Sequence, residues 1–104
     1  MAIDLPFTVE SMRQVLKWGA SPDASPVNHQ DIAHWCDRFH MKMFDVDTDH
    51  AMDVATGIAA DVDAQWDLYL ANKYSLQELQ QLDFSKEQLP VEWFRDWLKE
   101  LVNT

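Results

Sequence analysis

Apolar residues recur along this chain at the three- and four-residue spacing of amphipathic helices, and no stretch alternates long enough to predict a strand. The first such segment carries Met12, Val15 and Leu16 on one face. Thr8 precedes it as a plausible N-cap, and Gly19 follows where a left-handed C-cap is favoured. The pattern therefore predicts a first helix over Val9–Trp18.

A loop with two Ser-Pro pairs follows, because the residue before a proline is pushed away from the helical region. Asn28 then offers an N-cap for a second helix, predicted over His29–Met43. Its apolar stripe consists of Ile32, Trp35, Cys36, Phe39 and Met43.

The third predicted helix is the longest, from Thr48 or Asp49 to Asn72. Its core-facing sector is predicted to hold Ala51, Ala55, Ile58, Val62, Trp66 and Tyr69, with Asp53, Asp63 and Asp67 on the far side. Gly57 lies in its interior, where glycine costs about 1 kcal/mol relative to alanine, and this suggests a close approach by another helix.

Two further helices complete the pattern. The run from Ser75 to Glu78 is a capping box for a short helix over Leu76–Leu82. Pro90 suits the first position of a last helix reaching Val102, with an apolar stripe of Phe94, Trp97, Leu98 and Leu101. With only two glycines and four prolines, the sequence predicts one all-α domain of about five helices over residues 1–104.

The net charge of the chain indicates which class of macromolecule it can bind. The chain has 18 acidic and 8 basic residues, a net charge of −10, and its middle third, residues 41–72, holds seven aspartates and one base. Such a field repels nucleic acid and anionic membranes and favours a basic protein surface. The candidate protein-binding residues are Asp45, Asp47, Asp49, Asp53, Asp63, Asp67 and Trp93. Trp93 is included because it lies off the apolar stripe and tryptophan is common at binding hot spots.

The Asp-x-Asp-x-Asp run at Asp45, Asp47 and Asp49 resembles the opening of an EF-hand calcium loop. That loop needs glycine at its sixth position and a bidentate glutamate at its twelfth, where this chain has His50 and Thr56. The run is therefore interpreted as the acidic start of the long helix, where negative charge stabilises the helix dipole.

Cys36 and His40 are four residues apart, a spacing that can place two ligands on one metal, and His29 lies on the same flank. No Cys-x-x-Cys or His-Glu-x-x-His motif supports the pair, and a cysteine in an apolar stripe is usually a core residue.

A single cysteine predicts no internal disulfide and a reducing, cytoplasmic setting. The sequence offers no signal peptide, membrane span, catalytic motif or phosphate-binding loop, so no enzyme activity and no cofactor are predicted.

These observations predict a small acidic helical protein that acts by binding another protein, such as an inhibitor or immunity-type partner of a basic protein. Two alternatives remain open. One is an obligate subunit or homodimer that buries the surplus aromatic residues between chains. The other is a metal-binding protein that uses Cys36 and His40.

Overall fold

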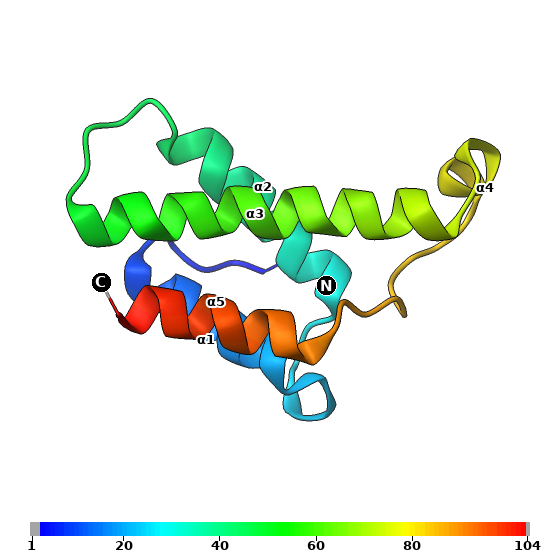
Figure 1. The fold of residues 1–104 in the computed structure, drawn as a ribbon, viewed down its shortest axis with the longest axis horizontal. Coiled ribbons are helices and arrows are strands. Elements are labelled where there is room, and N and C mark those ends of the chain that lie inside the picture. Colours follow the sequence, from blue (N-terminus) through cyan, green and yellow to red (C-terminus); the bar gives the residue numbers. More distant parts are fainter. Residues whose placement is uncertain (1–2, 104) are drawn as a thin grey trace.

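The computed structural model describes residues 3–103 and forms an all-α domain, with no strand in that range (Figure 1). Its elements are α1 (Val9–Ala20), the 3-10 turn η1 (Pro22–Ala24), α2 (His29–Met43), α3 (His50–Lys73), α4 (Leu76–Gln81) and α5 (Val91–Val102). The predicted all-α class is confirmed, and the five predicted helices are all present within one or two residues of their expected bounds. None of the described helices is both long enough and apolar enough to cross a membrane.

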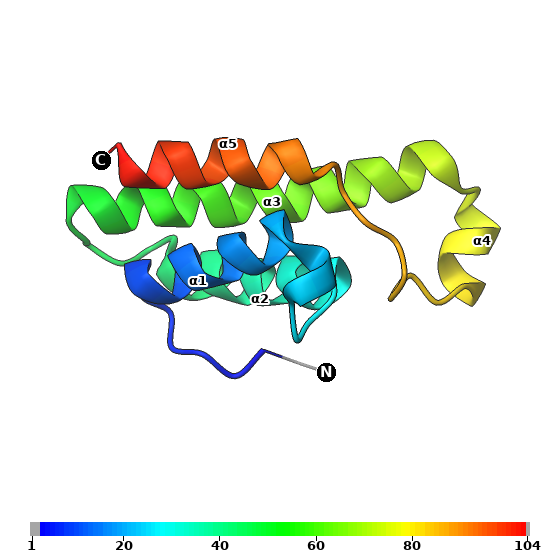
Figure 2. The same cartoon turned by 90° about the horizontal axis from the view of Figure 1, so that it is seen from below.

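The helices pack as two pairs. The two largest interfaces join α2 to α3 and α1 to α5. Helix α5 runs antiparallel beside α3, and α4 projects beyond the far end of α3 (Figures 1 and 2). The long helix α3 therefore has α2 on one flank and α5 on the other, and this arrangement sets the surfaces described below.

The core lies between these pairs and is rich in aromatic rings. Trp35, Phe39 and Phe94 are among the largest fully buried side chains, and Phe7 packs against the first two. The predicted stripes of the second and last helices are buried except at Met43 and Leu98, which are partly buried. In α3 the buried side chains are Ala55, Ile58, Ala59, Val62, Trp66 and Leu70. The buried sector is therefore rotated from the predicted one, and Ala51 and Tyr69 lie at its edge.

Side-chain caps explain where the helices begin. Thr8, Asn28 and Asp49 each accept a hydrogen bond from a backbone N–H three residues later, and Ser75 forms the full capping box. These bonds satisfy donors that the first turn of a helix leaves unpaired. Pro90 is the N-cap of α5 instead of its first helical residue.

Both glycines behave differently from the predictions. Gly19 lies inside α1, which continues to Ala20, and no described residue has the positive φ of a left-handed cap. A Cβ at Gly19 would overlap the ring of Phe94, so glycine here allows α5 to approach α1. Gly57 is exposed, and beyond its own helix no described residue lies within 4 Å of where its Cβ would be, so none of the described helices approaches it closely.

His29 joins three parts of the chain at the centre of the domain. Its Nε2 lies 3.0 Å from the carbonyl oxygen of Gly19, and its Nδ1 accepts a hydrogen bond of 2.8 Å from the backbone N–H of Leu89. The ring also packs against Phe94, with 4.5 Å between centroids. The start of α2 is thereby tied to the end of α1 and to the segment that leads into α5.

Candidate functional site

The acidic run between α2 and α3 is exposed and partly engaged in starting the helix. Asp49 caps the backbone N–H of Met52 at 2.9 Å, and Asp53 accepts a hydrogen bond from the hydroxyl of Thr48. Asp45 and Asp47 are exposed to solvent on the connection itself. Within residues 3–103 no group of three or more His, Cys, Asp or Glu side chains is arranged to hold a metal ion. Asp49 is therefore the N-cap of α3, and Asp53 lies in its first turn.

Asp63 and Asp67 do not share the surface of that run. Asp63 is partly buried at the seam between α2 and α3, and this corrects its predicted place on the far side, because α2 covers that flank of α3. Burial raises the pKa of Asp63, and the carboxylates of Asp37 and Asp67 raise it further, while His40 and His34 act in the opposite direction. The seam is thus a place where like charges face one another.

The residues of the predicted metal pair have different surroundings. Cys36 is completely buried, and burial, followed by the negative charge of Asp63, raises the pKa of its thiol well above the ordinary value. A thiolate is therefore disfavoured at this position. His40 is partly buried and packs against Phe44, and both ring nitrogens of His29 are engaged with the backbone. These contacts favour packing roles for the three residues.

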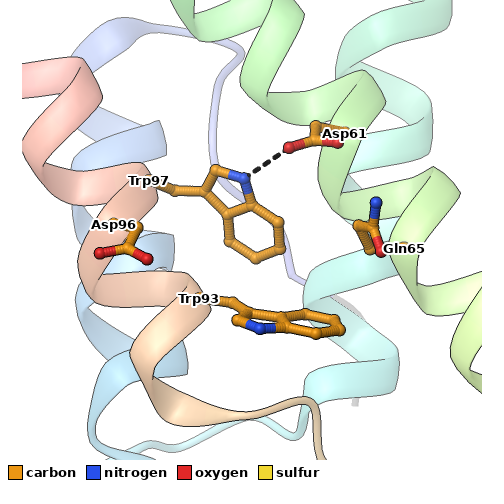
Figure 3. A pocket seen from close by; sticks show the side chains of 5 residues that line it. All are labelled: Asp61, Gln65, Trp93, Asp96 and Trp97. Atoms are coloured by element: carbon orange, nitrogen blue, oxygen red, sulfur yellow. Dashed lines mark hydrogen bonds between the residues drawn. The ribbon is translucent and has the colours of Figure 1, made fainter.

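On the opposite flank of α3, Trp93 lines a hollow of about 330 Å³. Its walls are Asp61, Gln65, Trp93, Asp96 and Trp97, and Figure 3 shows both indoles reaching from α5 towards α3. Trp97 donates an indole hydrogen bond of 2.8 Å to Asp61 Oδ2. Its ring meets that of Trp93 edge to face, with 6.5 Å between centroids and 74° between planes. The geometry of the hollow is thus set by contacts between its own residues.

A second hollow of about 380 Å³ shares Gln65 and Trp93 with the first. Its other residues are Leu68, Tyr69, Asn72 and Lys73. Leu68 is 55% exposed, which is high for a large apolar side chain. The two hollows together are called the α3–α5 groove below, and partly buried Trp93 lies between them.

The structure therefore separates the predicted site residues. Trp93 lies in the α3–α5 groove. Of the six predicted aspartates, Asp45, Asp47 and Asp49 lie on the α2–α3 connection and Asp53 lies in the first turn of α3, while Asp67 is near Asp63 at the seam with α2. The sequence did not predict that Asp61, Asp96 and the indole N–H of Trp97 belong to this site. One signal was present: Asp61, Gln65, Leu68 and Asn72 are spaced 4, 3 and 4 residues apart, which places them on one helical face.

No protein-family model, curated protein or solved structure shows significant similarity to this chain. What can be proposed for its function rests on the side chains described above.

Proposed function

We propose that this chain is a protein-binding domain that associates with a basic surface of another protein, in the manner of an inhibitor or immunity-type partner. The observation that supports this proposal is an excess of negative charge that ion pairs between described residues compensate only to a small extent. The chain has ten more acidic than basic residues, and the ion pair found between described residues is that of Lys73 with Glu87, at 2.9 Å.

Carboxylates close to one another repel in the folded domain: burial raises the pKa of Asp63, and the charges of Asp37 and Asp67 raise it further. A cationic partner removes part of that repulsion on binding, and a long-range field of one sign accelerates encounter with such a partner. A basic nucleic-acid-binding site on an enzyme or toxin has the complementary charge. Covering that site is how an acidic protein of this kind would inhibit.

Carbodiimide cross-linking in the native host tests the proposal, because it joins carboxylates to lysine amines at contact distance. A tagged chain is compared with a variant that carries Asp45→Lys, Asp47→Lys and Asp67→Lys, three exposed positions. We expect mass spectrometry to identify one basic protein cross-linked to the unmodified chain and absent from the variant. The loss should be complete, because attraction becomes repulsion at three points of the surface.

The matched control carries Asp4→Lys, Asp23→Lys and Glu100→Lys, which are exposed positions outside the predicted set with the same total change of charge. It should retain the cross-linked partner. Equal cross-linking by both variants, or no cross-linked protein from any of the three chains, would contradict the proposal.

The alternative of an obligate subunit or homodimer has one supporting observation. Met41, Phe44 and Val46 are 63%, 62% and 50% exposed around the end of α2. Exposed apolar side chains that lie close together often form part of a protein–protein interface. Sedimentation equilibrium at high protein concentration tests the homodimer, and a monomer there counts against it.

A further inference from the structure

We infer that the α3–α5 groove binds an arginine side chain of the proposed partner. Its guanidinium lies against the indole of Trp93, and its N–H groups donate hydrogen bonds to Asp61 and Asp96. The inference rests on the proposed function, since it names the chemistry by which one surface recognises a basic protein.

The two carboxylates are available to a ligand. Asp61 and Asp96 are exposed, line the same hollow and form no ion pair with a described base. Asp61 is held in place because its Oδ2 accepts the indole N–H of Trp97, and its second oxygen is left for another donor. Part of the ordering that a binding site requires is therefore completed before the ligand arrives.

The aromatic wall selects for a flat cation. A guanidinium can lie over an indole face and donate several N–H groups in its own plane, so it can satisfy two carboxylates while stacked. Gln65 adds an amide oxygen on the α3 side of the hollow. A lysine ammonium is a compact, strongly hydrated charge and makes poorer use of this combination.

The remaining charge of the groove agrees with a cationic ligand. Lys73 lines the far hollow, but its Nζ lies 3.1 and 2.9 Å from the two carboxylate oxygens of Glu87. Glu87 also accepts a hydrogen bond from the hydroxyl of Tyr74. The positive charge of Lys73 is thereby compensated within the chain, whereas no described base forms an ion pair with Asp61 or Asp96. A purely apolar ligand would remove water from both carboxylates without replacing its hydrogen bonds.

Nuclear magnetic resonance titration of the whole chain tests the inference through the indole N–H signals of its five tryptophans. The probe is a capped Gly-Gly-Arg-Gly-Gly peptide, compared with peptides in which citrulline or lysine replaces the arginine. We expect the arginine peptide to shift the Trp93 and Trp97 signals saturably. Neutral citrulline, which has nearly the shape of arginine, should bind at least about tenfold more weakly.

The variant with Asp61→Asn and Asp96→Asn should lose about the same factor, since asparagine keeps an oxygen for the Trp97 hydrogen bond but removes both charges. A control with Asp63→Asn and Asp67→Asn removes two charges on the flank towards α2 and should bind like the unmodified chain. Equal shifts from citrulline, equal losses in both variants, or equal affinity for lysine would overturn the choice of an arginine ligand.

Shifts of the same signals with protein concentration alone would also overturn it, because they would identify a second copy of the chain as the occupant. The two proposals fail separately. A cross-linked partner without arginine binding in the groove rejects this anchor and leaves the proposed function. Arginine binding without any cross-linked partner rejects the function in the host.

Discussion

His29 is a buried side chain whose protonation state is determined by its neighbours. Because Nδ1 accepts from the Leu89 N–H, the proton of the neutral ring must lie on Nε2, where it can be donated to the Gly19 carbonyl. A second proton on Nδ1 would face the Leu89 N–H and break that contact. Burial lowers the pKa of His29, and its bond to Gly19 opposes this effect only partly.

This arrangement predicts a loss of stability in mild acid. Above the unfolded-state pKa of about 6.5 the ring is neutral in both states and the hydrogen bonds are intact. As the pH falls below that value, the unfolded chain binds the proton first. The free energy of unfolding should therefore decrease, by at most about 1.4 kcal/mol per pH unit, until the pH reaches the lowered folded-state pKa. Urea unfolding between pH 8 and pH 5 measures this slope.

The comparison variant is His29→Gln, which has a donor and an acceptor but does not titrate. Its stability should be lower than that of the unmodified chain at pH 8, and the difference should shrink as the pH falls. Subtracting the two curves also removes the contributions of the other histidines and of Asp63, which both chains share. Parallel curves would show that His29 takes up its proton equally well in the folded and unfolded states.

At the scale of the helices, the two glycines make a matched pair with opposite surroundings. Gly19→Ala places a Cβ against the Phe94 ring and should lower the free energy of unfolding by about 1–3 kcal/mol, the usual cost of overpacking. Gly57→Ala enters open space on an exposed helix and should raise it by up to about 1 kcal/mol. Chemical denaturation of the two variants measures both effects.

A double-mutant cycle then tests the cause. In a Phe94→Leu background, which removes the ring, Gly19→Ala should be less costly, whereas Gly57→Ala should have the same effect as before. If Gly19→Ala proves neutral in the unmodified chain, the close contact between α1 and α5 does not set the requirement for glycine there.

The helices themselves were predictable because their signals are local. Caps at Thr8, Asn28 and Ser75, and the apolar stripe of α2, depend on residues within a few positions of one another. The exact sector that α3 buries was not predictable, because it depends on where α2 and α5 pack. The contact between Gly19 and Phe94 was missed for the same reason: glycine after an apolar run usually indicates a cap, and the ring that excludes a side chain lies 75 positions away.

The candidate site was predicted only in part. Trp93 was singled out because it lies off the stripe of its helix, and it does line the α3–α5 groove. Its neighbours there, Asp61 and Gln65, come from a helix some 30 positions earlier, and no local pattern links them to it. The density of acidic residues along the sequence led to the run before α3 as the predicted binding site. The composition of the groove instead depends on which acidic residues the packing of α3 against α5 places beside Trp93.

At the scale of the whole molecule, charge is the dominant feature. Self-repulsion among the acids, which outnumber the bases by 18 to 8, destabilises the compact state, and dissolved salt screens this repulsion. Between 0.01 and 0.1 M NaCl the Debye length falls from about 30 to about 10 Å, which covers most distances between surface carboxylates of a small domain. The melting temperature should therefore rise with salt, by roughly 4–8 °C for each 1 kcal/mol of repulsion relieved.

The variant with Asp45→Lys, Asp47→Lys and Asp67→Lys changes the net charge by two units at each position, from −10 to −4, so its melting temperature should rise less steeply with salt. Calcium and magnesium chlorides at equal ionic strength provide the control, since simple screening makes them equivalent. A larger effect of calcium would indicate that the run from Asp45 to Asp49 binds the ion. A flat or falling melting temperature in NaCl would mean that the acids are compensated within the folded chain, and the proposed function would lose the observation that supports it.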